Sequence, residues 1–146
     1  MNISIEISRK IALAYAAVCK PFCKELGLPQ TAFDILMFLG NNPKYKTASE
    51  IVDIRRIKAN LVSVNVDRLV RDGYLVRQPG KYDRRKTELY CTEKAQPIIE
   101  KGQRLQENFF TRLFADMDDD TRKAFLAAMG ILEENLNAIL EAEDGQ

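Results

Sequence analysis

The sequence predicts a mainly α-helical fold with one small β-hairpin. Apolar residues recur at helical spacing over most of the 146 residues. The period changes to two only near residues 74–91, where two short segments flank a turn rich in Gly, Pro and charge. The composition is that of a globular protein, and no apolar run is long enough to span a bilayer. We expect a single domain over residues 1–146 that has no membrane partner.

Two helices are predicted at the start of the chain. The first covers about residues 4–25, and Gly27 is its stop signal. The second begins near Pro29, is apolar on most sides, and ends at an Asn-Asn-Pro run that closes with Pro43. We therefore expect the second helix in the centre of the core.

A short helix and a longer helix follow, and a basic turn joins them. Thr47 and Glu50 have the spacing of a capping box, which predicts a helix over about residues 48–54. The next helix covers about residues 58–72, and Gly73 closes it. Its inward face is formed by Val62, Val66, Leu69 and Val70.

A hairpin comes next, with predicted strands at residues 74–77 and 86–91 around the charged turn 78–85. We expect Thr92 to cap the helix after it, and Pro97 to delay or kink that helix.

A last helix opens near Asp118 and carries a heptad-like seam. Such a seam indicates packing against the first helix or against a second subunit, with core packing inside the monomer as the alternative. The seam consists of Phe125, Met129, Leu132, Leu136 and Ile139.

The net charge of +1 hides a strong segregation of charge. Residues 55–86 hold ten Lys or Arg against three Asp, a net +7, so the other residues together carry −6. A positive segment on an otherwise acidic body is typical of a surface that binds a polyanion. A merely solvated charged face would mix both signs.

The order helix, turn, helix, basic hairpin is the winged helix-turn-helix arrangement. Its second helix fits the major groove of DNA, and the hairpin, or wing, lies along the backbone or reaches the minor groove. The sequence therefore predicts double-stranded DNA as a partner. The alternative from another class is a winged helix that binds an acidic protein.

Three stretches carry a more specific pattern: residues 47–51, residues 66–75, and the wing positions Asp83, Arg85, Leu89 and Thr92. In these the sequence resembles the MarR family of bacterial regulators, and the likeness extends over nearly the whole chain. The resemblance implies a homodimer built from helices in residues 1–28 and 95–146, with a winged helix-turn-helix lobe over residues 29–94. It also implies a repressor that binds a pseudopalindromic operator and responds to a small molecule or an oxidant.

Two positions depart from the family's usual sequence. Val64 and Asn65 stand where an Arg-Leu pair is frequent, so the operator sequence does not carry over. Asn65 also faces inward, and we expect it to need a buried hydrogen-bond partner.

Candidate DNA contacts come from the basic turn, the outer face of the helix over residues 58–72, and the hairpin. Asn60 or Ser63 could bond base edges and Leu61 or Val64 could meet a thymine methyl, with phosphate contact or solvent as the alternatives. Four of the cations, Arg55, Arg56, Lys58 and Arg71, suit phosphates. The full predicted set is Arg55, Arg56, Lys58, Asn60, Leu61, Ser63, Val64, Arg68, Arg71, Lys81, Asp83, Arg84, Arg85 and Lys86.

In the wing, Asp83 can hold one neighbouring guanidinium by a forked hydrogen bond, which leaves the other free for the minor groove. The resemblance assigns the wing-arginine role to Arg85.

An effector site is expected where the first helix meets the second and the fifth. By resemblance its lining includes Tyr15, Cys19 and Phe22. Cys19 and Cys23 share one helix face, so they are either redox-sensing thiols or small buried apolar residues. Three cysteines form no disulfide framework, which favours a reducing compartment, and we expect the cytoplasm.

An enzyme is not expected. The chain has no His, no glycine-rich phosphate loop and no carboxylate pair in an apolar frame. Two cysteines leave a tetrahedral zinc unfilled, so we expect no metal and no cofactor.

Overall fold

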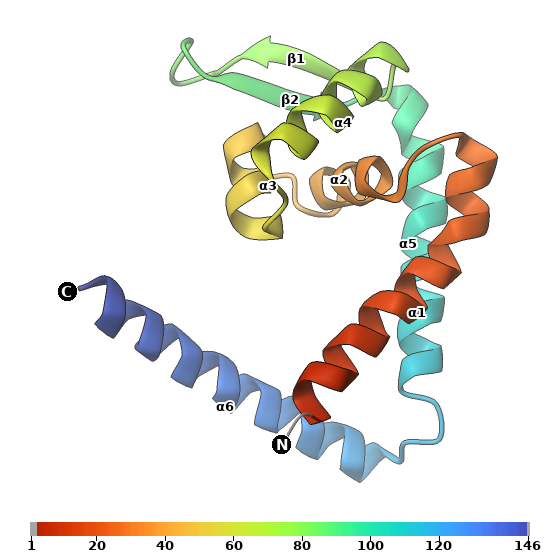
Figure 1. The fold of residues 1–146 in the computed structure, drawn as a ribbon, viewed down its shortest axis with the longest axis vertical. Coiled ribbons are helices and arrows are strands. Elements are labelled where there is room, and N and C mark those ends of the chain that lie inside the picture. The colour runs from red at the N-terminus through yellow and green to blue at the C-terminus, as the bar shows by residue number, and fades with distance from the viewer. Residues whose placement is uncertain (1–2, 146) are drawn as a thin grey trace. The chain divides into compact units, whose positions relative to one another are not determined.

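The computed structural model describes residues 3–145. The chain forms two compact units, residues 1–109 and residues 110–146, which are described separately. Figure 1 shows the course of the elements along the chain. The predicted fold class is confirmed, because helices dominate and the sheet has two antiparallel strands. The expectation of a single domain stays a prediction.

The first unit contains the winged helix-turn-helix elements. In chain order they are α1 (Ile3–Leu26), α2 (Gln30–Asn41), α3 (Ala48–Arg55), α4 (Ala59–Arg71), β1 (Leu75–Pro79), β2 (Thr87–Cys91) and a 3₁₀ turn at Glu93–Ala95, followed by α5 (Gln96–Leu113), whose last residues enter the second unit.

The centre of the core is α2, as its apolar character predicts. Seven of its residues are buried: Ala32, Phe33, Ile35, Leu36, Met37, Phe38 and Leu39. The ring of Phe33 meets that of Phe22 on α1 edge to face, at 5.7 Å between centroids. Helices α1 and α4 both pack against it.

Helix α5 approaches α2 closely because glycines lie at the contact. A β-carbon at Gly40 would lie 2.9 Å from the Ile99 side chain, and one at Gly102 would lie 2.5 Å from the Met37 sulfur. Real β-carbons essentially never show such distances, so the crossing depends on the missing side chains.

Local signals set the limits of the helices as predicted. Thr47 and Glu50 form the complete capping box of α3. Gly27 and Gly73, with φ of 68° and 86°, end α1 and α4 in the left-handed region. Arg56 adopts the same region with φ of 57° to close α3, a conformation that costs a residue with a β-carbon about 1 kcal/mol.

Asn65 is buried, as predicted, and its partner is local. Its side-chain amide donates to the Leu61 carbonyl one turn earlier at 2.8 Å. The buried polar group is thus bonded inside α4 itself.

The prediction for Thr92 is wrong, because its side chain makes no capping hydrogen bond to the following turn. Its hydroxyl instead donates to the Gly73 carbonyl at 2.6 Å, and its amide donates to the Tyr74 carbonyl at 3.0 Å. Thr92 therefore closes the base of the hairpin. The delayed helix start predicted from Pro97 is confirmed, because a 3₁₀ turn precedes α5 and Pro97 lies in the first turn of α5.

The hairpin is attached to the core at two places. Leu75 and Leu89 point inward and are buried. In addition, the Leu89 amide donates to the Lys46 carbonyl at 2.6 Å, which ties β2 to the segment before α3.

The second unit contains α6 (Asp119–Asp144), which Asp118 caps by accepting the Thr121 amide at 2.7 Å. None of the described side chains of α6 is buried. The whole predicted seam from Phe125 to Ile139 is exposed.

Within residues 3–145, none of the helices combines the length and the apolar character that a membrane span requires.

The contact between Gly40 and Ile99 gives a first prediction. We expect Gly40→Ala to lower the free energy of unfolding by about 1–3 kcal/mol, because the added methyl overpacks the α2–α5 contact. Ile99→Ala should cost about 2–5 kcal/mol through its cavity. The double variant should lose less than the sum, since the new methyl then has room. Urea unfolding of the four proteins measures this coupling, and strictly additive losses would contradict it.

Candidate nucleic-acid interface

The outward face of α4 is the centre of the candidate interface. Val62, Val66 and Leu69 turn inward and are buried. The predicted base-reading residues are exposed on the rest of the helix, and Val64 is 64% and Leu61 44% exposed. The structure therefore places on the outer surface of the helix Asn60, Leu61, Ser63 and Val64.

Exposed cations surround this face. Arg55 is the last residue of α3, Arg56 lies in the α3–α4 turn, Lys58 is the residue immediately before α4, and Arg71 is the last residue of α4. All four side chains are exposed. The first half of α4 is uncharged, and cations lie at both of its ends. This arrangement would allow the cations to bind phosphates on either side of a groove.

Arg68, one of the predicted DNA contacts, is bonded within the protein. Its guanidinium donates to the Gly27 carbonyl at 2.8 Å, and its Nε is buried without a hydrogen-bond partner among the described residues. The left-handed turn at Gly27 exposes this carbonyl beside α4, so Arg68 is drawn towards α1. Its Nε also lies 3.9 Å from the Asp72 carboxylate, and the side chain stays 40% exposed, so Arg68 connects helices while part of its guanidinium faces solvent.

The wing turn presents a fixed arginine. Asp83 accepts from Arg85 through Nε at 3.1 Å and Nη2 at 3.3 Å, so the forked pair predicted for one of the two arginines holds Arg85, the expected wing arginine, and Arg84 is the one that Asp83 does not hold. The same carboxylate accepts the Arg85 backbone amide at 3.1 Å. Hydrogen bonds from Arg85 hold the pKa of Asp83 below its usual range. Arg85 nevertheless stays 91% exposed.

The turn itself depends on Gly80. A β-carbon there would lie 2.2 Å from the Asp83 carbonyl oxygen. The Gly80 amide donates to the Lys86 carbonyl at 2.8 Å, which closes the loop. The predicted wing residues Lys81, Arg84 and Lys86 are exposed around it.

An ion pair that the sequence reasoning missed links α4 to the wing. Arg77 on β1 donates to the Asp67 carboxylate on α4. The sequence places Asp67 on the outward face of its helix and Arg77 at the end of the first strand, without pairing them. The signal was available, because strand alternation places Arg77 on the same side as the buried Leu75.

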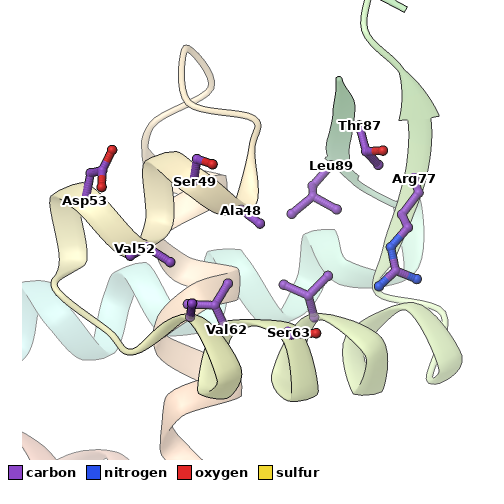
Figure 2. Close-up of a pocket in the computed structure, with 11 residues that line it drawn as sticks. Ala48, Ser49, Val52, Asp53, Val62, Ser63, Arg77, Thr87 and Leu89 are labelled. Carbon is purple, nitrogen blue, oxygen red and sulfur yellow. The ribbon is translucent and has the colours of Figure 1, made fainter. Parts of the chain in front are cut away.

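Arg77 also borders a cavity of about 470 Å³ between α3, α4 and the hairpin, lined among others by Val62, Ser63 and Leu89. Figure 2 shows Arg77 extending from β1 towards α4, with Val62 and Ser63 on the helix below.

The predicted effector residues lie together on α1 but are well packed. Tyr15 accepts a hydrogen bond from Gln106 on α5 at 2.9 Å, and its ring meets that of Phe109 edge to face. Cys19 is fully buried and Cys23 is 6% exposed. Burial raises the pKa of the Cys19 thiol, and it raises the pKa of Cys23 to about 11. These environments favour buried thiols over reactive ones.

Among residues 3–145, no group of His, Cys, Asp and Glu has the arrangement to hold a metal ion.

The geometry described so far is that of a winged helix-turn-helix protein. Residues 26–86 match the family model of the MarR family. The predicted resemblance is therefore confirmed, and the matched residues include both helices of the motif and most of the wing. A search of curated protein sequences found no significant match.

Solved structures share the fold over nearly the whole chain. A MarR transcriptional regulator from Methanosarcina mazei Go1 is 20% identical with a TM-score of 0.78, over 95% of this chain and 99% of that one. A MarR family transcriptional regulator from Listeria monocytogenes, complexed with a 26mer DNA, is 21% identical with a TM-score of 0.78, over 97% and 95%. A SlyA-like transcription regulator from Listeria monocytogenes is 21% identical with a TM-score of 0.77, over 100% and 95%. The chain has the MarR-type fold.

The cysteine environments give a second prediction. Because burial raises the pKa of both Cys19 and Cys23, very little thiolate is present near pH 7, and we expect iodoacetamide to modify neither residue quickly in the native protein. In urea both should react, which serves as the control. Mass spectrometry of timed digests measures the modification. Fast labelling of Cys19 in the native protein at pH 7 would contradict this prediction and would favour a redox-sensing role for that thiol.

Proposed function

We propose that the protein is a DNA-binding transcriptional regulator that acts as a homodimer in the cytoplasm, most simply as a repressor. The observation that carries this proposal is that α4 and the wing are exposed and basic together, in the segment 55–86 that holds a net +7. Its three cysteines are free thiols, as suits a reducing compartment. The DNA complex of the Listeria monocytogenes regulator, which shares this fold, also supports it.

In the proposed complex, α4 lies in the major groove and the wing follows the adjacent backbone. Lys58 and Arg71 bind phosphates beside the two ends of α4, while Arg55 and Arg56 bind phosphates from the preceding turn. At the wing tip, Arg85 enters the minor groove although it is the arginine that Asp83 holds, because the fork fixes the orientation of the exposed guanidinium and so lowers the entropy lost on binding.

Homodimer formation follows from the exposed apolar surface. In the first unit, Ile5, Ile7, Ile11 and Leu13 of α1 are exposed. In the second unit, the seam of α6 is exposed along its length. Apolar surface of this extent on helices marks an interaction surface, and a second copy of the same chain offers the matching one.

A small molecule is the effector we favour over an oxidant. The α1 thiols are buried with raised pKa, which disfavours oxidation. A ligand near Tyr15, Cys19 and Phe22 would act on α1, α2 and α5 at once, because Tyr15 bonds Gln106 on α5 and Phe22 packs on Phe33 of α2.

The roles of wing and helix give a third prediction. Arg85→Ala should weaken operator binding by about 1–3 kcal/mol and reduce any preference for A·T-rich flanks, since the arginine gains from the potential of a narrow minor groove. Lys58→Ala should weaken binding about equally on all sequences. The slope of the logarithm of the binding constant against the logarithm of the salt concentration should become shallower by about one unit for each subunit, which makes about two for a dimer. Fluorescence titrations at several salt concentrations measure both.

Arg84→Ala is the matched control for Arg85, since Arg84 is also an exposed wing arginine but is not held by Asp83. Equal operator affinity for Arg85→Ala and the unchanged protein would remove Arg85 from the mechanism. If no DNA is bound even at low salt, a protein-interaction module becomes the better assignment.

The assembly gives a fourth prediction. The chain should scatter light as a dimer at micromolar concentration, and Leu132→Glu should shift it to a monomer, because the charge must be desolvated at the seam. Ala127→Glu, on the opposite face of α6, adds the same charge and should leave the dimer intact. A stable monomer of the unchanged chain would overturn the proposal of a homodimer.

A further inference from the structure

The first two turns of α4 have no charged side chain. Residues 59–66 contain no Lys, Arg, Asp or Glu. In helix-turn-helix proteins these turns of the recognition helix contact base edges. The commonest specific contact there is an Arg or Lys that donates two hydrogen bonds to guanine. That donor is missing from this part of α4.

Two arginines beside these turns are engaged elsewhere. Arg68 follows them on α4 but donates to the Gly27 carbonyl at 2.8 Å, and its Nε is buried. Arg77 reaches α4 from β1 but donates to Asp67. This pair also takes up an acceptor on Asp67 that would otherwise be available to the amino group of cytosine. The charged groups nearest to these turns are therefore each partly engaged within the protein, which leaves uncharged side chains in the middle of the outward face.

Val64 occupies the middle of the outward face instead. The buried Val62, Val66 and Leu69 define the inward side of α4, and helical geometry places Val64 nearly opposite them. Val64 is the most exposed aliphatic side chain of the winged-helix lobe within the described residues, and Leu61, itself 44% exposed, lies next to it. Asn60 is one turn before Val64 on the same face.

We propose that Val64 reads the 5-methyl group of thymine in the major groove, with Leu61 beside it, so that A·T pairs define each half-site. This inference rests on the proposed DNA binding through α4. Thymine is the base that presents a methyl group in the major groove, and aliphatic side chains recognise it by contact. Asn60 supplies the complementary polar contact, because a carboxamide both donates to and accepts from adenine.

The test begins with selection of bound duplexes from a random pool by the full-length chain. Each thymine of the selected half-site is then replaced in turn by 2′-deoxyuridine, which removes only the methyl group. At one thymine or two adjacent ones, affinity should fall about fourfold per half-site, the factor expected for one buried methyl-sized group. Val64→Ala should bind the thymine duplex more weakly and lose most of the preference for thymine over deoxyuridine.

Val76→Ala is the matched control, because Val76 is an exposed valine on β1 away from α4. It should retain the preference for thymine over deoxyuridine. The Val64 side chain is exposed, so thermal unfolding of Val64→Ala should match that of the unchanged protein. Two outcomes overturn the thymine assignment alone. The first is sequence-specific binding with equal affinity for thymine and deoxyuridine at every position, and the second is a Val64→Ala protein that keeps the preference for thymine. Absence of DNA binding overturns the proposed function together with it.

Discussion

The burial of α2 on all sides is the constraint on which the rest of the first unit depends. A helix with seven buried residues among twelve is stable only when other elements cover it. Helices α1, α4 and α5 provide this cover, and Gly40 and Gly102 allow α5 close enough to do so. Because α4 uses its inward valines and leucine for this purpose, its opposite side is necessarily turned to solvent. The outward face of α4, at the centre of the candidate interface, is therefore exposed because the opposite face of the same helix packs on α2.

Among the residues that the structure describes, the buried core is apolar apart from Asn65, whereas residues 55–86 carry ten Lys or Arg and three Asp. Within that segment the arginines differ in their bonding partners. Arg85 is held by a neighbouring carboxylate, Arg68 by a distant backbone carbonyl, and Arg77 by an ion pair that links two elements. Positive charge alone therefore does not say which side chains are available to a partner.

Most of the fold could be predicted from the sequence because its signals are local. The capping box at Thr47, the left-handed glycines 27 and 73, and the change of period at the hairpin all act within a few residues. The contacts that the sequence did not reveal join distant residues. Arg68 meets a carbonyl 41 positions away, and the Thr92 hydroxyl meets one 19 positions away. No periodicity encodes such partners, because they exist only once the helices have packed.

The local features of the candidate site could also be predicted from the sequence. Exposure of Asn60, Leu61, Ser63 and Val64 follows from helix geometry once the inward stripe is known. The Asp83 fork required only adjacent residues. The pairing of Asp67 with Arg77 required the hairpin to fold back over α4, and this lay beyond a reading of either element alone.

The hairpin is bonded to the helices of the lobe mainly at its base. Thr92 is bonded to Gly73 and Tyr74, Lys94 donates to the Asp72 carbonyl at 2.6 Å, and Leu89 is bonded to Lys46. Beyond these bonds the strands extend into solvent towards a turn that is closed by its own residues. Amide exchange in such a hairpin is graded, fast at the turn and slow at the root. A hairpin that is attached in this way can change the position of its turn while the helices that anchor it keep their packing.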